Sequence, residues 1–599
     1  MRNQKRLSQK PAPVAPSPRL LPELLKLVAT DHLHANDVAG SLKLLCRDAA
    51  ACLGKRFQTL TLGHRRTAAD EPHRAVHPWP GHAFMAHWGR PEPWRVLNFA
   101  QRKRLLCLAA SSGHAGSLEA ALAHCGVAPG RSDEVMVSAA AAGCVPACER
   151  LMREGCWPNH ISVPAAAKAG HIPVLKAMLS FKAPIDAPWR YSTHVKQAGE
   201  AACAGGQADT LAWLQRQHGY QLSSAAVVAA AKGGQAAMLD RLVARLPQHY
   251  AQPGSGKRGK AAAAAALEAC CPRWRLLEAV AEGCSVEAFR HWYDAMWVWP
   301  SDPDYGGRSA NQSLVKLRND SYAGLLTAAA SSATACWAAK VDLLLSAWGP
   351  AVAAEVLQMR RGRHCAVEQA AARPDYCQRL RHLHAAGMPL FAGEDACAAK
   401  HGHADALMYL WDERRLPLRV DSGFLEHHVM GQQGVIGEFA AGRMQVVRLL
   451  RERGAALYAE QAFQEASENG CSLEVLAWLA EVAEDGEYAN WSFTTALAAG
   501  KGAGLPLLQA LLRRCGGDDP LSFTSLAFAA DGASVEALEW LAARMKEAGS
   551  EPEVLTPDQV MALAEPQANT AALAWLYERG LIAPEEVEQL QEDGLLRHS

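Results

Sequence analysis

The chain has 599 residues, far more than one ordinary domain holds, so it forms several domains or an array of repeats. Its 61 basic and 61 acidic residues balance, which excludes a global charge that would draw it to nucleic acid or to a membrane surface. Alanine is abundant and β-branched runs are scarce, so we expect an all-α protein. No apolar run approaches the ~18–20 residues of a membrane span.

The 17 cysteines are scattered singly, which favours buried thiols in a reducing compartment over a disulfide framework. We therefore expect an intracellular protein, either cytoplasmic or nuclear. Residues 1–20 form a basic, Pro-rich tail for which disorder is expected. An organelle transit peptide is the alternative, because no acidic residue precedes Glu23.

Residues 21–62 form a compact apolar block that begins with a Pro-initiated helix and continues with a second helix capped by Asn36-Asp37. The second helix is expected to hold Val38, Leu42 and Leu45. Three short helices in about 40 residues bury little apolar surface by themselves. The block therefore needs a partner surface.

The block opens with Leu21-Pro22-Glu23-Leu24-Leu25, continues with Leu33, Asn36-Asp37 and Val38, and ends near Cys46-Arg47. In these residues it resembles an F-box, although Asp48-Ala49-Ala50 stands where an aromatic residue often follows. The resemblance implies a helical module that docks on the adaptor of a cullin-type ubiquitin ligase. The docking residues it implies are Leu21, Pro22, Leu24, Leu25, Leu33 and Val38. The alternative is a small helical cap on the segment that follows.

Residues 63–104 are polar and Pro-containing, and we interpret them as a linker or irregular junction held by Trp79, Phe84 and Trp88. From residue 105 onward, one unit recurs with a period of about 30 residues: a small-residue segment, a glycine and then an apolar pair. The glycines of this unit are Gly113, Gly143, Gly170, Gly234, Gly402 and Gly470. Tryptophans recur at one position of the unit, at Trp213, Trp478, Trp540 and Trp575, where packing between repeats explains them better than ligand stacking.

The second half of this unit is seen in Ala109–Leu122 with Gly113-His114, in Ala166–Leu179 with Gly170-His171 and again in Gly402-His403. In these residues it resembles that of ankyrin repeats. The Thr-Pro-Leu-His opening of the ankyrin repeat is missing throughout. The resemblance implies an α-solenoid of divergent helix–turn–helix repeats over residues 105–583. Insertions are expected near residues 247–260 and 297–320, and an acidic cap at residues 584–599.

No pattern in the chain has the context that catalysis or cofactor binding requires. Gly254–Gly259 matches G-x-G-x-x-G, but no strand precedes it. The close cysteine and histidine pairs lack a second pair at zinc-site spacing. We therefore expect no enzyme activity, no cofactor and no metal.

What remains is recognition of other proteins by the concave surface of a repeat array. The leading hypothesis is a substrate-recognition subunit of a cullin-type ligase, and the alternative is a plain ankyrin-repeat scaffold. No nucleic acid or membrane partner is expected, and the chain is expected to be a monomer outside its complex. Candidate partner-binding residues are Trp157, Trp189, Tyr191, Trp299 and Tyr305.

Overall fold

The structure is a computed structural model that describes residues 22–45, 47–66, 71–181, 188–245, 273–297, 320–359, 366–391, 393–417, 438–454, 477–478, 481, 491–513, 523–550, 553–564, 568–592 and 595. Within these ranges every regular element is a helix, and the one extended pairing is an isolated bridge between Gly63 and Ala75. The expected all-α class is therefore confirmed. In the same ranges, no helix has the length and apolar character needed to cross a membrane.

The N-terminal block folds as a module of short helices around a small core. Its segments are α1 (Pro22–Leu27), the π-helical η1 (Val28–His32), α2 (Ala35–Asp37), the π-helical η2 (Val38–Leu42), α3 (Lys43–Leu45) and α4 (Arg47–Leu53). Ala29, Val38 and Leu53 form the buried core, with Leu42 and Phe57 packed against it. So small a core leaves much of the module's apolar surface uncovered.

A buried asparagine joins the module to the segment that follows. Asn36 is only 2% exposed, and its Nδ2 donates to the carbonyls of Thr61, at 2.8 Å, and Pro78, at 3.3 Å. Its Oδ1 accepts from the backbone N of Thr61 at 2.9 Å. Because a buried amide is costly to leave without partners, Asn36 fixes the module against residues 61–78.

The junction at residues 63–104 contains helices, contrary to the expected irregular linker: α5 (Gly81–Trp88), α6 (Glu92–Arg95) and the start of α7 (Phe99–Ser111). The array thus begins at Phe99, before residue 105. α7 starts there because Asn98 Oδ1 accepts from the backbone N of Gln101 at 2.9 Å, while Gln101 Oε1 accepts from the backbone N of Asn98 at 3.1 Å. This reciprocal capping box satisfies two donors at the end of the helix.

The helices of the array follow one another in pairs. The first pairs after α7 are built from α8 (Ala115–His124), α9 (Asp133–Ala141), α10 (Val145–Arg153), α11 (Ser162–Ala169), α12 (Ile172–Ser180), α13 (Pro188–Ala204), α14 (Ala208–His218), α15 (Ser224–Lys232) and α16 (Ala236–Arg245), with a 3-10 turn, η3 (Pro129–Arg131). The middle of the array contains helical residues 273–283, α19 (Val286–Met296), helical residues 320–330, α21 (Trp337–Leu357), α22 (Ala366–Ala370), α23 (Tyr376–Ala385), α24 (Glu394–Lys400), α25 (Ala404–Met408), the π-helical η5 (Tyr409–Glu413) and α27 (Glu438–Glu452). The last part contains α30 (Trp491–Gly500), α31 (Leu505–Leu512), α32 (Phe523–Ala530), α33 (Val535–Glu547), α34 (Pro557–Ala564), α35 (Thr570–Glu578) and α36 (Pro584–Glu592).

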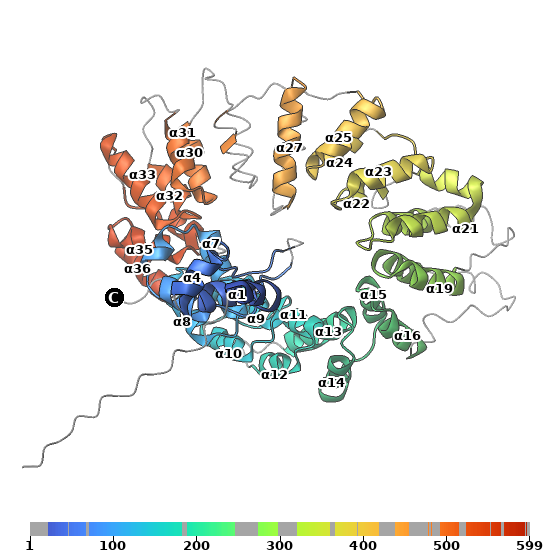
Figure 1. The fold of residues 1–599 in the computed structure, drawn as a ribbon, viewed down its shortest axis with the longest axis horizontal. Helices are drawn as coiled ribbons and strands as arrows, with labels where there is room; N and C mark the ends of the chain where they lie inside the picture. Colours follow the sequence, from blue (N-terminus) through green and yellow to red (C-terminus); the bar gives the residue numbers. More distant parts are fainter. Residues whose placement is uncertain are drawn as a thin grey trace, which may run out of the picture.

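The first helix of each pair packs on the first helix of the next pair, as α9, α11, α13 and α15 do in turn. Figure 1 shows these helices toward the middle of a ring, with α10, α12, α14 and α16 outside them. The apposed faces are rich in alanine, so the backbones approach closely. One hydrophobic core runs through the successive pairs from Phe84 to Leu595. This is the sequential packing of a helical solenoid, as the repeating unit predicted.

The two ends of the array meet, so that the described helices follow a ring (Figure 1). The backbone N of Phe99 donates to the carbonyl of Gly532 at 3.0 Å, and Asn98 Nδ2 donates to the carbonyl of Gly502 at 2.8 Å. The backbone N of Ala571 donates to the carbonyl of Gly126 at 3.3 Å. We refer to these contacts between α7–α8 and the last helices as the seam.

Arg102 occupies the middle of the seam and is 1% exposed. Its NH2 donates to Asn569 Oδ1 at 2.7 Å, and its NH1 donates to the carbonyls of Cys125 at 2.7 Å and Gly126 at 3.0 Å. Burial lowers the pKa of Arg102 to about 10, so the guanidinium stays charged at neutral pH. Because a buried cation needs hydrogen-bond acceptors in fixed positions, these bonds make Arg102 the central polar contact of the seam.

Candidate protein-interaction site

Among the described residues, exposed leucines are found in the N-terminal module and not in the array. Leu24 and Leu27 of α1 are 47% and 50% exposed, and Leu44 and Leu45 of α3 are each 75% exposed. We call these four residues the module leucines. Several exposed leucines on one small module make it a candidate for a surface that another molecule covers.

The predicted docking residues divide between the surface and the core of the module. Pro22, Leu24 and Leu33 are exposed, whereas Leu25 and Val38 are buried, and Leu21 lies outside the described residues. Leu25 and Val38 therefore pack inside the module and are not available for docking. Leu45, expected in the second helix with Val38 and Leu42, is on the surface, and Val38, Ala29 and Leu53 form the core.

Three of the module leucines, Leu27, Leu44 and Leu45, were absent from the predicted docking set. The feature of the sequence that could have indicated these exposed leucines is the adjacent pair Leu44-Leu45. Neighbouring residues of a helix point about 100° apart, so Leu44 and Leu45 cannot both face so small a core. The sequence alone does not show which leucines the core selects.

A second candidate surface lies on the outer side of the ring between α10, α12 and α14. It is a shallow groove of about 500 Å³ lined by Val145, Glu149, Pro173, Lys176, Ala177, Leu179, Ser180, Trp213 and His218. The rings of Trp213 and His218 meet edge to face at 4.6 Å, and the hydroxyl of Tyr191 contacts Nδ1 of His218. Partial burial lowers the pKa of His218, which keeps the imidazole neutral at pH 7. The groove thus has an aromatic and aliphatic wall, with the carboxylate of Glu149 and the ammonium of Lys176 at its surface.

The predicted partner-binding residues lie only partly at this groove. Tyr191 is 44% exposed and contacts the groove through His218, while Trp157, 40% exposed, is not among the residues that line it. The side chain of Trp189, and the residues Trp299 and Tyr305, lie outside the described part of the structure.

The repeat glycines lie where the chain turns between the two helices of a pair. Gly113, Gly143, Gly170, Gly234 and Gly402 all have positive φ, between 71° and 84°. Gly170 ends α11 in the left-handed region, which other residues seldom adopt. Gly470 lies outside the described residues.

The repeat tryptophans pack against the core. Trp575 is 4% exposed, and Trp213, Trp478 and Trp540 are half-buried against the same continuous cluster. Trp213 in addition lines the outer groove, so a packing position and a surface position coincide there.

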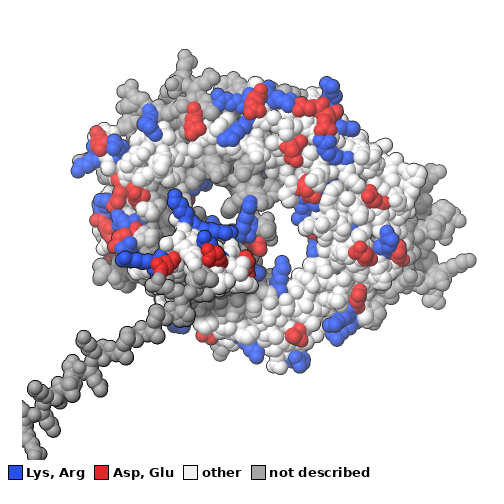
Figure 2. Space-filling view, viewed as in Figure 1, with Lys and Arg blue, Asp and Glu red and all other residues white. Residues whose placement is uncertain are grey.

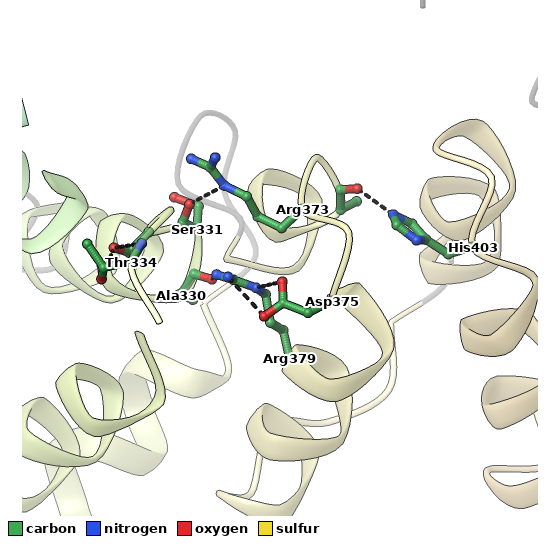
Figure 3. Close-up of polar contacts among 9 residues, drawn as sticks. Ala330, Ser331, Thr334, Arg373, Asp375, Arg379 and His403 are labelled. Carbon is green, nitrogen blue, oxygen red and sulfur yellow. Dashed lines mark hydrogen bonds and ion pairs between the residues drawn. The ribbon is translucent and has the colours of Figure 1, made fainter. Parts of the chain in front are cut away.

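Polar side chains connect successive repeats through the carbonyls that end the inner helices. Nε2 of His171 is 3.2 Å from the carbonyl oxygen of Ala141, and Nε2 of His403 is 2.8 Å from that of Ala371 (Figure 3). Burial lowers the pKa of His403, so it donates as a neutral imidazole. The histidine after the glycine therefore satisfies the end of the preceding helix, where carbonyls lack intrahelical partners.

Lysine and arginine side chains make the same connection between repeats in the middle part of the array. Lys340 Nζ donates to the carbonyl of Ala281 at 2.8 Å, and Arg379 donates to the carbonyl of Ala330 (Figure 3). Arg379 also donates from Nε to Oδ1 of Asp375 at 2.7 Å. Although burial acts to raise it, the Arg379 hydrogen bond and charge lower the pKa of Asp375. These groups support the fold.

Two clusters have residue types found in catalytic sites, but both are buried. Lys340 Nζ lies 3.0 Å from Ser332 Oγ, and both residues are fully buried. Nε2 of His384 lies 3.3 Å from a carboxylate oxygen of Glu394, and their side chains are each 1% exposed. In the described residues no group of three or more His, Cys, Asp or Glu is arranged to hold a metal ion.

Comparisons with family models, with curated proteins and with solved structures gave no match to this chain.

Proposed function

We propose that this chain is a recognition subunit that binds other proteins through its N-terminal module and its repeat ring. In this proposal the module is F-box-like and docks on the adaptor of a cullin-type ubiquitin ligase. The ring consists of divergent ankyrin-type repeats and holds the target protein. The chain itself performs no chemistry.

The observation that carries the proposal is the exposure of the module leucines. Asn36 and residues 61–78 fix the module to the array, yet Leu24, Leu27, Leu44 and Leu45 stay outside both cores. Fully burying one leucine is worth about 1.5–3 kcal/mol, so a partner that covers several of them gains substantial binding energy. The described surface of the array has no comparable group of leucines.

Support for ankyrin-type repeats comes from the turn. In two of the helix pairs, the glycine with positive φ is followed by a histidine whose ring lies at a carbonyl of the preceding repeat. This interaction gives a physical reason for the Gly-His pair on which the resemblance rests. The outer groove around Trp213 is the surface proposed for the target.

The module leucines can be tested in the full chain. Replacing both Leu44 and Leu45 with arginine is expected to weaken binding to a purified cullin-ligase adaptor at least about tenfold, because two anchors of the interface are lost. Surface plasmon resonance measures this loss, and circular dichroism confirms that the fold is unchanged. Val554→Arg is the matched control, since Val554 is 54% exposed but belongs to the array. Equal binding by the double variant and the control, or no adaptor binding by the parent chain, contradicts the proposal.

The alternative is a plain ankyrin-type scaffold in which the module only caps the array. The observation that favours it is the close attachment of the module to the array. Asn36 binds the segment after the module, and within that segment the backbone N of Ala75 donates to Ser111 Oγ of α7 at 3.0 Å. In that case the Leu44 and Leu45 variant leaves partner binding unchanged, and removal of the module lowers the melting temperature of the array.

A further inference from the structure

The module and the segment after it carry an excess of positive charge. Figure 2 shows Lys and Arg side chains beside the opening in the middle of the ring, with Asp and Glu side chains close to them. Among the described residues from 22 to 76, basic residues outnumber acidic ones: Lys26, Lys43, Arg47, Lys55, Arg56, Arg65, Arg66 and Arg74 stand against Glu23, Asp31, Asp37, Asp48 and Glu71. This balance differs from that of the whole chain, whose formal charge is zero.

The backbone that carries Lys55 and Arg56 is held in place. The ammonium of Lys43 donates to the carbonyls of Gly54 at 3.0 Å, and of Arg56 and Phe57, each at 3.4 Å. Gly54 and Phe57 both have positive φ, of 54° and 62°, so the loop turns sharply after α4. Three donors on one cation order this loop, and both basic side chains on it are exposed.

Arg74 lies on a short pairing of two extended segments. The backbone N of His64 donates to the carbonyl of Arg74 at 2.9 Å, and Gly63 forms the bridge with Ala75. A Cβ at Gly63 would meet the side chain of Leu108 at 2.7 Å, so this side of the pairing faces α7. His64 and Arg74 point the other way, since alternate residues of extended chain face opposite sides, and both are exposed.

Arg66 and Arg104 lie beside these residues. The NH1 of Arg66 is 3.2 Å from Nε2 of His73. Burial, and after it the positive charge of Arg66, lowers the pKa of His73 to about 4, and Arg104 and Lys103 act in the same direction. Glu134 acts oppositely but is already paired with Lys103 at 2.9 Å. The charges around His73 are therefore positive on balance.

We refer to Lys55, Arg56, Arg66, Arg74 and Arg104 as the basic edge. Within the described residues, none of the five forms an ion pair with a carboxylate. Some arginines elsewhere on the ring do have such partners. Arg150 pairs with Glu119, Arg381 with Glu413 and Arg453 with Asp412.

We propose that the basic edge binds an acidic segment of a protein partner. This inference rests on the proposed role in protein recognition but is independent of adaptor docking. Complementary charge sets which partner is attracted and how fast it associates. A short carboxylate-rich segment complements basic side chains that have no carboxylate partner among the described residues.

A nucleic acid is the less suitable partner. A long polyanion that extends beyond the basic edge meets the acidic side chains that Figure 2 shows interspersed with basic ones around the ring. Single-stranded binding also relies on exposed aromatic rings for stacking, and Phe57, the aromatic residue of the loop, is packed against the module core.

The test uses the full chain and a fluorescein-labelled peptide of alternating Glu and Ser, with binding measured by fluorescence anisotropy at low and at physiological ionic strength. The double variant Lys55→Glu/Arg74→Glu is expected to weaken binding about tenfold or more, and salt is expected to weaken binding by the parent chain. Arg290→Glu/Lys546→Glu is the matched control: it makes the same change in net charge at exposed positions of α19 and α33.

Loss of peptide binding in the edge variant alone supports the proposal. Equal loss in both double variants, no binding of the peptide at low ionic strength, or tighter edge-dependent binding of a single-stranded oligonucleotide overturns it. The failure of this proposal and of adaptor docking can be distinguished, because the edge variant is expected to keep adaptor binding and the Leu44 and Leu45 variant to keep peptide binding.

Discussion

Replacing Arg102 with methionine is expected to open the ring and to lower the free energy of unfolding by about 3–5 kcal/mol. Methionine fills similar space but donates no hydrogen bond, so the carbonyls of Cys125 and Gly126 and the side chain of Asn569 lose a buried charged donor. Urea unfolding measures the stability. Small-angle X-ray scattering measures the maximum dimension, which is expected to increase when the seam separates.

Arg104→Met is the matched control, because Arg104 lies on the same helix with an exposed side chain. It is expected to change stability by no more than about 0.5 kcal/mol and to leave the maximum dimension unchanged. If Arg102→Met and Arg104→Met unfold at the same urea concentration with the same dimension, the seam does not hold the ring closed.

Replacing Gly205 or Gly233 with alanine is expected to cost about 3 kcal/mol, because the inner helices touch there through their backbones. A Cβ at Gly205 would lie 2.0 Å from the carbonyl oxygen of Lys168, and a Cβ at Gly233 would lie 2.0 Å from that of Ala204. Such a contact with backbone cannot be relieved by a side-chain rotation. Successive repeats must move apart, and the alanine faces between them lose contact.

Gly219→Ala provides the comparison for this pair of variants. Gly219 has a φ of 65°, but a Cβ there would meet nothing within 4 Å. The cost is therefore limited to the backbone strain of alanine in the left-handed region, about 1 kcal/mol. Urea unfolding of the three variants separates the two effects. Equal costs at Gly205 and Gly219 mean that close packing between repeats contributes nothing beyond backbone conformation.

The local features of the fold were predictable from the sequence. Gly143 and Gly170 indicated turns because glycine, unlike other residues, adopts positive φ at little cost. The alanine segments before them indicated helix faces that can approach a neighbour closely. The capping box of Asn98 and Gln101 is also a local feature that the sequence contains. The start of α7 at Phe99 was nevertheless missed, because the polar residues around it were interpreted as a linker.

The contacts between distant parts were not predictable in the same way. Arg102 and Asn569 are 467 positions apart, and no periodic pattern indicates that one satisfies the other. A repeat period predicts that neighbours stack, but ring closure depends on the small rotation between repeats summed over the whole array. The choice between Leu25, which is buried, and Leu44, which is exposed, depends likewise on how the short helices of the module pack.

Hydrogen–deuterium exchange of the full chain, with and without the cullin-ligase adaptor, tests adaptor docking by the module most directly. The amides of α1 and α3, which carry the module leucines, are expected to exchange more slowly in the complex, while those of the outer groove are unaffected. Unchanged exchange in both helices, or protection confined to the ring, would contradict the assignment of the module as a docking site.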